Sequence, residues 1–245
     1  MKRRLLLAAG SALAASAYEP TQKKSNSLIE LRSYKLRNTL DGMPKRLNEF
    51  LAKQHLPALQ KAGISKLGFF STMIGAGSPC ILQVTEFKNL AQMEASWDAA
   101  SSAIASFVRI ESSLLRSFDG FPAIEMPAAE AGRAPRVFEL RTYESNDFTT
   151  LGKKIGMFNS GEISIFRKTG LNPVFFGETI FGTNIPNLTY MLWYDSLAAR
   201  EANWKKFISH PEWDKLKTTP GLSDAEVVSN ISNSILSPTA YSPIR

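Results

Sequence analysis

This sequence has little of the chemistry on which most catalytic and metal-binding motifs depend. It contains one cysteine and two histidines. Cys80 cannot form an intramolecular disulfide, and its place at the start of a predicted strand favours a buried small side chain over a nucleophile. His55 and His210 lack the HxxxH and HExxH spacings of zinc sites, and the chain has no GxGxxG, P-loop or GxSxG motif. The sequence therefore predicts no metal site and no cofactor.

Strong charge and long apolar runs are also missing. The formal net charge is +7, but the basic residues are scattered among carboxylates, so no nucleic-acid partner is expected. An apolar stretch near the start of the chain, at residues 5–13, is too short to span a bilayer core of roughly 30 Å as a stable anchor. These features exclude a nucleic-acid binder and argue against a stable membrane anchor.

Residues 1–17 instead predict an export signal. Residues 2–4 (KRR) form a basic region, the apolar stretch follows, and residues 15–17 (ASA) are typical of a signal-peptidase cleavage site. The arginine pair followed by leucines fits twin-arginine export, and Sec export stays open. We expect a mature chain from near Tyr18, with a net charge of about +4 after the loss of three positive charges. Such a chain would reside in the periplasm or outside the cell.

The remaining chain reads as two similar halves. We expect a flexible leader at residues 18–27, a first domain at 28–120, a linker rich in proline, alanine and glycine at 121–135, and a second domain at 136–245. Strand patterns of period two alternate with helical patterns in each half. Both domains are therefore predicted to have the order β-α-β-β-α-β.

Matching motifs indicate an internal duplication. Residues 30–34 read ELRSY and residues 139–143 read ELRTY. Trp97 and Trp204 stand at corresponding positions of the last predicted helix in each half, where both are expected to be core residues. A β-α-β-β-α-β unit is typical of a ferredoxin-like sheet with both helices on one face. The predicted fold is therefore α+β, with two tandem ferredoxin-like units packed sheet against sheet as a pseudo-dimeric α/β barrel within one chain.

The repeated strand motif carries the main candidate site. Because side chains alternate along a strand, its glutamate, arginine and tyrosine share one face. We expect the apolar face to pack on the helices and the polar face to point into the space between the two sheets. The predicted ligand-binding residues are Glu30, Arg32, Tyr34, Glu139, Arg141 and Tyr143.

Two interpretations of these residues stay open. They fit a structural network in which Glu–Arg pairs and tyrosine hydroxyls fix how the two sheets pack. They also fit a cleft that binds a small polar, anionic or aromatic ligand through its arginines and tyrosines. The candidates for acid–base catalysis are Tyr34, Tyr143 and His55, and His55 fits a partly exposed helix residue as well.

Several segments resemble the NIPSNAP family. They are the ELRSY and ELRTY strands, EFKNLAQMEASW and WYDSLAAREANW, the HPEW segment, and the closing ILSPTAYSPI. The resemblance covers nearly the whole mature chain as two copies and implies a dimeric α/β-barrel fold. The activity of the family is poorly defined, and the mitochondrial and vesicle roles of its eukaryotic members do not carry over to an exported protein. The related barrel superfamily includes small monooxygenases and haem-dependent enzymes, which is an analogy of fold alone.

Two functions follow as expectations. The first is an exported NIPSNAP-type protein that binds a small molecule or takes part in assembly, using the cleft between its two sheets. The alternative is a cofactor-independent enzyme, similar to a monooxygenase or an isomerase, that acts on a small aromatic or carbonyl substrate. The scarcity of catalytic motifs favours the first, and a homodimer is compatible with both.

Overall fold

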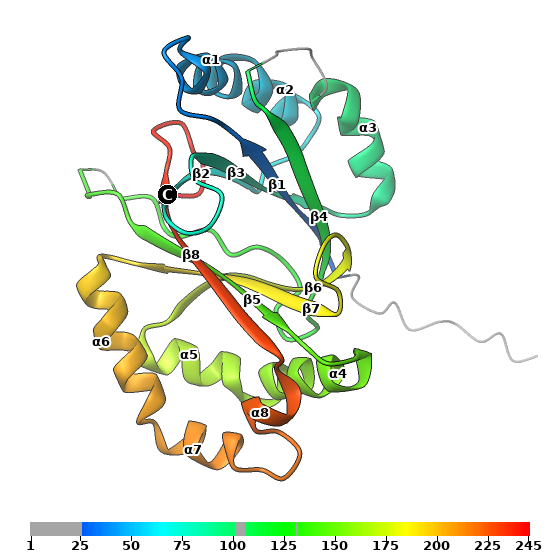
Figure 1. Ribbon diagram of the computed structural model, residues 1–245, viewed down its shortest axis with the longest axis vertical. Coiled ribbons are helices and arrows are strands. Elements are labelled where there is room, and N and C mark those ends of the chain that lie inside the picture. Colours follow the sequence, from blue (N-terminus) through cyan, green and yellow to red (C-terminus); the bar gives the residue numbers. More distant parts are fainter. Residues whose placement is uncertain (1–25, 101–105, 131) are drawn as a thin grey trace, which may run out of the picture.

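The computed structural model describes residues 26–100, 106–130 and 132–245. The predicted signal peptide and most of the predicted leader lie outside these residues. Eight antiparallel strands form one closed barrel in the order β1-β3-β2-β8-β5-β7-β6-β4. The helices lie outside the barrel in two groups, one beside each half of the strands (Figure 1).

The first half of the chain supplies four strands and one group of helices. Its strands are β1 (Leu28–Lys35), β2 (Leu67–Ile74), β3 (Cys80–Phe87) and β4 (Arg109–Ser117). Its helices are α1 (Met43–Phe50), the π-helical turn η1 (Leu51–His55), α2 (Leu56–Lys61) and α3 (Leu90–Ala100). Cys80 is buried at the start of β3, as predicted.

The second half repeats this arrangement with additional short helices. Its strands are β5 (Val137–Glu144), β6 (Asn172–Phe181), β7 (Asn187–Tyr194) and β8 (Asn230–Pro238). Its helices are α4 (Phe148–Met157), the π-helical turn η2 (Phe158–Glu162), α5 (Ile163–Thr169), α6 (Leu197–Ile208), α7 (Pro211–Lys217) and α8 (Asp224–Val227).

The strand pairs explain how the barrel closes. The order is β4-β1-β3-β2 in the first half and β8-β5-β7-β6 in the second. The halves join along two seams, where β2 pairs with β8 and β4 pairs with β6. The edge strands of each half are therefore covered by the other half. The prediction of a mixed α/β barrel built within one chain is confirmed at this level.

Both halves interrupt their first helix with a π-helical turn. Pro57 is expected to kink the first of these helices, and η1 indeed lies directly before α2, whose first turn contains Pro57. The turn η2 occupies the corresponding place in the second half without a proline in its sequence, FNSGE. The last residues of the two turns, His55 and Glu162, are both buried. Because π-helical turns are often found at functional sites, both positions are of interest.

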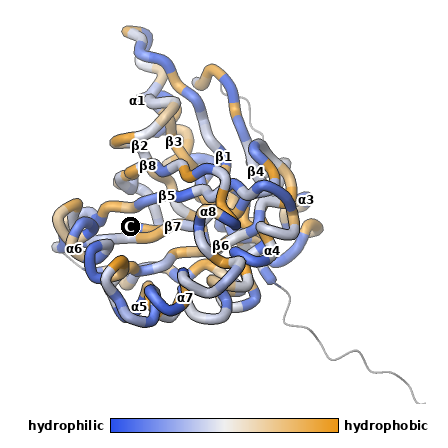
Figure 2. The backbone as a smooth tube through the Cα atoms, turned by 60° about the horizontal axis from the view of Figure 1, so that its bottom comes forward, coloured by the Kyte–Doolittle hydropathy of each residue, from blue (hydrophilic) through white to orange (hydrophobic). Residues whose placement is uncertain are grey.

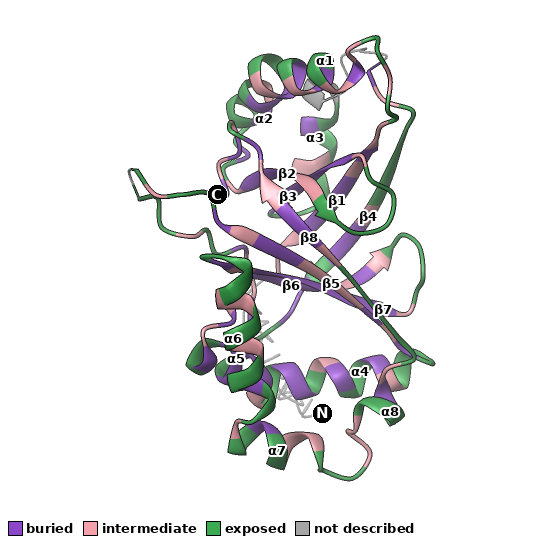
Figure 3. Ribbon diagram, turned by 60° about the vertical axis from the view of Figure 1, so that its left-hand side comes forward, coloured by how far each residue is buried: buried purple, intermediate pink, exposed green. Residues whose placement is uncertain are grey.

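The buried apolar residues that the structure describes form three clusters. One lies inside the barrel and combines residues of both halves, including Ile29 and Phe138. The other two lie between the strands and the helices of each half, and they include Tyr34 in the first half and Tyr143 in the second. Figure 3 shows the resulting pattern, in which the strands are largely buried while the outer sides of the helices are exposed.

The two faces of β1 are therefore oriented opposite to the expectation. Ile29 and Leu31 face the barrel interior, whereas Tyr34 belongs to the cluster under the helices. The prediction that the glutamate, arginine and tyrosine of each motif point into the space between the sheets is wrong, and the same correction holds for β5. The physical reason is that the interior is enclosed by paired strands, while the helix side offers polar side chains that can pair with buried charges.

Apolar residues are distributed in short stretches along the chain. Figure 2 shows that polar and apolar residues interrupt one another along most strands and helices. Among the helices that the structure describes, none has both the length and the apolar character needed to cross a membrane. Many of the apolar residues belong to the three clusters described above.

Candidate functional site

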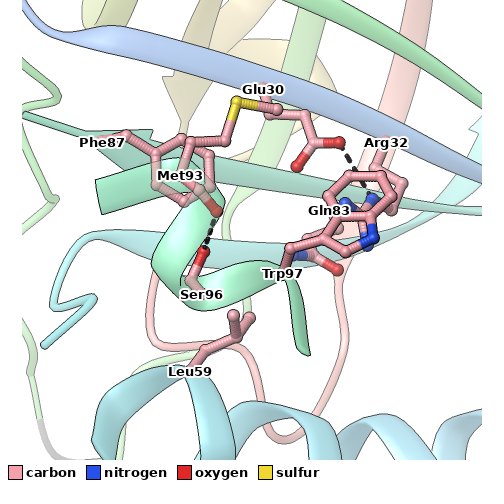
Figure 4. A pocket seen from close by; sticks show the side chains of 8 residues that line it. All are labelled: Glu30, Arg32, Leu59, Gln83, Phe87, Met93, Ser96 and Trp97. Carbon is pink, nitrogen blue, oxygen red and sulfur yellow. Dashed lines mark hydrogen bonds and ion pairs between the residues drawn. The ribbon is translucent and has the colours of Figure 1, made fainter. Parts of the chain in front are cut away.

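The charged residues of the β1 motif, Glu30 and Arg32, lie beneath α3 and form a polar set with their partners. The Nε atom of Arg32 donates to Oε1 of Glu30 at 2.9 Å, and the Ser112 hydroxyl donates to the same oxygen at 2.7 Å. The guanidinium carbon of Arg32 lies 5.2 Å from the ring centre of Trp97 on α3, a cation–π arrangement. Figure 4 shows Trp97 lying against Arg32, with Gln83 next to them. Trp97 is 54% exposed, so its prediction as a core residue is wrong.

Gln83 on β3 connects Tyr34 to His55. Its Oε1 atom accepts a hydrogen bond from the Tyr34 hydroxyl at 3.0 Å and lies 2.9 Å from Nε2 of His55. The Gln83 amide nitrogen donates to the Thr85 hydroxyl at 2.8 Å. An acceptor facing Nε2 assigns the imidazole proton to that nitrogen. The other ring nitrogen, Nδ1, is buried and has no hydrogen-bond partner among the residues that the structure describes.

Burial keeps His55 and Tyr34 neutral. It lowers the pKa of His55, and the hydrogen bond to Gln83 only partly opposes this shift. Burial also raises the pKa of Tyr34, against the opposing effect of the Arg32 charge. At neutral pH the site therefore presents a neutral phenol and a neutral imidazole whose Nδ1 carries a free lone pair.

A small cavity separates the polar set from α3. Its volume is about 10 Å³, which is room for one water molecule. The cavity is lined by Glu30, Arg32, Leu59, Gln83, Phe87, Met93, Ser96 and Trp97 (Figure 4). An open surface groove of about 560 Å³, lined by Leu90, Met93, Glu94 and Trp97, runs along the same helix. Met93 and Trp97 line both spaces, so they form the wall between groove and cavity.

The equivalent position in the second half is closed. The Glu139 carboxylate, which is fully buried, accepts hydrogen bonds from five side chains. The donors are Arg141, Tyr194, Arg200, Trp204 and Asn233. Burial on its own would raise the pKa of this carboxyl, but the Arg200 hydrogen bonds and the charges of Arg141 and Arg200 bring it down to about 2. Glu139 is thus a permanently charged and fully occupied acceptor at neutral pH.

Comparison with known families identifies the chain. The NIPSNAP family model matches residues 29–114 and 138–243. The chain belongs to the NIPSNAP family. No curated protein matches it in sequence. The motif strands, the cavity and the closed second site all lie within the two matched segments of this NIPSNAP protein.

Solved structures share the fold of this NIPSNAP protein at low sequence identity. A proposed monooxygenase from Lactobacillus acidophilus is similar with a TM-score of 0.59 and 10% identity, over 87% of this chain and 94% of that one. An anthrone oxidase-like protein is similar with a TM-score of 0.53 and 10% identity, over 89% and 93% of the two chains. A NIPSNAP family protein from Agrobacterium tumefaciens matches 45% of this chain and 99% of its own, with 23% identity and a TM-score of 0.40. At these identities the likeness concerns the fold alone.

Differences between the two halves of this NIPSNAP protein explain why one site is open. Aligned without gaps from β3 into α3 and from β7 into α6, the halves place Met93 opposite Arg200, and Phe87 opposite Tyr194. The first half therefore lacks two of the donors that occupy Glu139 in the second. Trp97 corresponds to Trp204, whose indole N–H donates to Glu139 at 3.1 Å. Fewer internal partners for the glutamate leave space beneath α3.

A second buried ion pair takes the place of His55 in the second half. Glu162 corresponds to His55, and the Lys154 ammonium lies 3.2 Å from its carboxylate. Burial raises the pKa of Glu162 to about 7, although the Lys154 charge opposes this shift. The Tyr190 hydroxyl donates to the Tyr143 hydroxyl. The corresponding residues of the first half, Gln83 and Tyr34, are hydrogen-bonded to each other as well. In the second half, the polar groups at these positions are therefore paired with one another.

The structure brings some of the sequence-predicted residues together and keeps others apart. Glu30 and Arg32 line one cavity together with Gln83, and Gln83 connects this cavity to Tyr34 and His55. Glu139, Arg141 and Tyr143 form a separate cluster under the helices of the second half, so the two sets do not share one cleft.

The sequence analysis missed Gln83 and Arg200. Gln83 interrupts the apolar run CILQV of β3, and a single amide in a buried strand is a usable signal. Arg200 stands where the first half has Met93, which is visible only when the halves are aligned. In the part of the chain that the structure describes, no group of three or more His, Cys, Asp or Glu side chains is arranged to hold a metal ion.

Proposed function

We propose that this NIPSNAP protein binds a small planar organic molecule in its first half, between β1, β3 and α3. The difference between the two glutamates carries this proposal. Glu139 is occupied by five donors, whereas Glu30 accepts side-chain hydrogen bonds from Arg32 and Ser112 among the described residues, and a cavity remains beside it. A buried charged pair beside unfilled space favours a ligand over a purely structural role.

The lining residues indicate the chemical class of the ligand. Trp97, Met93 and Phe87 would pack against a flat aromatic or conjugated body. Arg32 and Gln83 would contact an oxygen of the ligand, such as a phenol or a carbonyl group. The cavity holds only one water when Trp97 covers it, so such a ligand enters from the surface groove as the Trp97 side chain turns outward. Because Trp97 is already largely exposed, this movement breaks few packing contacts.

A second candidate function is cofactor-independent catalysis on the same ligand. The observation that favours it is the free lone pair on Nδ1 of a neutral His55, whose other ring nitrogen, Nε2, faces Gln83 in the cavity wall. A neutral imidazole can accept a proton from a weakly acidic phenol or enol, and Arg32 would stabilise the resulting anion. The names of two proteins with the same fold, a proposed monooxygenase and an anthrone oxidase-like protein, agree with oxidation of such a substrate, for which dissolved dioxygen would be the oxidant.

The test uses 1-naphthol as the probe and the full chain as the protein. We expect saturable binding, detected by tryptophan fluorescence and native mass spectrometry, that weakens at least about tenfold in Trp97→Ala. The matched control is Phe148→Ala, which removes an exposed aromatic side chain from α4 in the other half. Absence of binding, or equal binding by Trp97→Ala, would reject the proposal. Consumption of the probe in air that His55→Asn abolishes would favour catalysis over binding alone.

The remaining proposals rest on the sequence. We propose that the two halves are tandem ferredoxin-like units derived from duplication, since the element order and the two family matches support this reading. We also propose export through residues 1–17, because a basic region, an apolar stretch and a small-residue cleavage site follow one another there. Cleavage after Ala17, read by N-terminal sequencing of the secreted protein, tests the second point.

A further inference from the structure

The barrel interior changes character along its length. Side chains at every second position of β1 and β5 face inward, and the first of these are Ile29, Leu31, Phe138 and Leu140. Toward the end of both strands the inward positions become polar and small, with Ser33 on β1 and Thr142 on β5. The neighbouring strands begin at this end of the barrel and contribute further hydroxyl and amide groups. One end of the interior is therefore apolar and the other is polar.

The polar end contains a pocket of about 200 Å³. Its floor is formed by three leucines of the interior cluster, Leu31, Leu82 and Leu140. Its wall includes the hydroxyl groups of Thr142, Thr189 and Ser232. Leu140 and Thr142 are only partly buried although they face inward, because they border this pocket. The pocket shares none of its lining with the cavity beneath α3, so it is a separate candidate site.

Hydrogen bonds within the wall leave acceptors facing the pocket. The Asn187 amide nitrogen donates to the backbone oxygens of Thr183 and Asn184, which fixes its Oδ1 as an acceptor. Thr179 donates to this Oδ1 at 2.6 Å. The hydroxyls of Thr142 and Thr189 lie 2.9 Å apart, and one donates to the other. Each hydroxyl has one hydrogen and two lone pairs, so acceptor capacity remains unused.

The charges at the rim do not select an ionic ligand. Glu111, the carboxylate of the lining, pairs with Lys35 at 3.1 Å and with Arg109 at 2.7 Å. The other side chains that line the pocket are uncharged. The pocket therefore suits a neutral molecule that donates several hydrogen bonds to the wall and places an apolar face on the three leucines.

From this arrangement we propose a binding site for an uncharged polyhydroxylated ring of monosaccharide or cyclitol size. Its hydroxyl groups donate to Thr142 and its neighbours, and its C–H face packs on Leu31, Leu82 and Leu140. The volume is adequate for one six-membered ring and small for anything longer. This site is independent of the proposed function in the first half, since the pocket and the cavity beneath α3 share no lining residue, although Ser112, which donates to Glu30, also lines the pocket.

The proposal can be tested by NMR with two defined probes. D-Glucose and myo-inositol are titrated into the full chain carrying ¹³C-labelled leucine methyl groups. We expect saturable shifts of the Leu31, Leu82 and Leu140 methyl signals for at least one probe. Thr142→Val keeps the shape of the side chain and removes its hydroxyl, and we expect it to weaken binding about tenfold. Thr142→Ser, which retains the hydroxyl, should bind as the wild type does.

The control substitution is Thr149→Val, an identical change at an exposed position of α4. It should leave the titration unchanged. The proposal is overturned if neither probe shifts the three leucine signals at concentrations up to about 100 mM, a range that covers weak sugar binding. It is also overturned if Thr142→Val binds both probes as tightly as Thr149→Val. Loss of binding in both variants would likewise overturn the proposal, because binding would then not depend on the hydroxyl group in the pocket.

Discussion

The Arg200 guanidinium donates two hydrogen bonds to the Glu139 carboxylate, from Nε to Oε2 at 2.9 Å and from Nη2 to Oε1 at 2.5 Å. A bidentate contact of this kind is among the strongest that a carboxylate can accept in a protein. Its counterpart in the first half is the apolar Met93, which borders a cavity instead. This difference, together with Phe87 in the place of Tyr194, separates a closed structural site from an open one.

Removal of this guanidinium should destabilise the protein strongly. Arg200→Met leaves Glu139 buried with fewer partners, and we expect unfolding to become easier by about 2–4 kcal/mol. Urea denaturation at neutral pH measures the loss. Arg167→Met is the matched control, since Arg167 forms an exposed pair with Glu125 whose removal should cost less than about 1 kcal/mol. Equal losses in the two variants would show that the Glu139 network contributes no more than a surface pair.

Acid should weaken the fold through Glu139. Its pKa is about 2 in the folded protein, against 4.5 for an unperturbed glutamate. A lowered folded-state pKa means that the stabilisation is present above the unfolded value and is lost as the pH falls from about 4.5 toward 2. The full contribution is about 3 kcal/mol. Denaturation midpoints recorded across this range should fall steeply for the wild type and less steeply for Glu139→Gln. Parallel profiles would contradict the assignment.

His55 should add a second dependence on pH at higher values. Burial lowers its pKa below the ordinary 6.5, so the unfolded chain takes up a proton before the folded protein does. Stability should therefore begin to fall as the pH drops below about 6.5. Nitrogen-15 NMR of the imidazole at neutral pH should show a protonated Nε2 and an unprotonated Nδ1. A doubly protonated ring under those conditions would show that the environment of His55 differs from the one described here.

Much of the fold could be predicted from periodicity, whereas the orientation of the candidate site could not. Alternation along ELRSY correctly groups Glu30, Arg32 and Tyr34 on one face, because a strand has a period of two. The same pattern does not say which face the helices cover. Ile29 and Leu31 would satisfy an apolar environment on either side of β1. The decision depends on the partners that distant segments supply, and Gln83 and His55 come to lie beside Tyr34 only when β3 pairs with β1 and the first helix packs on these strands.

The cavity was beyond prediction from single motifs for a related reason. Both motif copies carry the same charged residues, and Trp97 and Trp204 suggest equal packing. The difference arises at Met93 and Phe87, two ordinary apolar residues that stand where the second half has donors. An apolar residue in a helix gives no signal of its own. Only the unfilled volume next to Glu30 reveals its effect.

Converting the open half to the closed pattern should abolish ligand binding. Met93→Arg introduces a guanidinium on α3 above Glu30, at the position from which Arg200 reaches Glu139. We expect it to pair with Glu30, fill the cavity and raise the free energy of unfolding by about 1 kcal/mol, because a buried carboxylate gains a charged donor. Binding of 1-naphthol should then be lost, while binding of the polyhydroxylated probe in the pocket at the polar end of the barrel persists.

Met93→Leu serves as the control, because it keeps the volume and the apolar character of the side chain. Chemical denaturation and the fluorescence titration are recorded on both variants. A stabilised Met93→Arg protein that no longer binds would establish that the missing donor creates the site in the first half. A Met93→Arg protein that is as stable as Met93→Leu and binds equally well would place the ligand elsewhere, and the cavity beneath α3 would then be a packing defect that the fold tolerates.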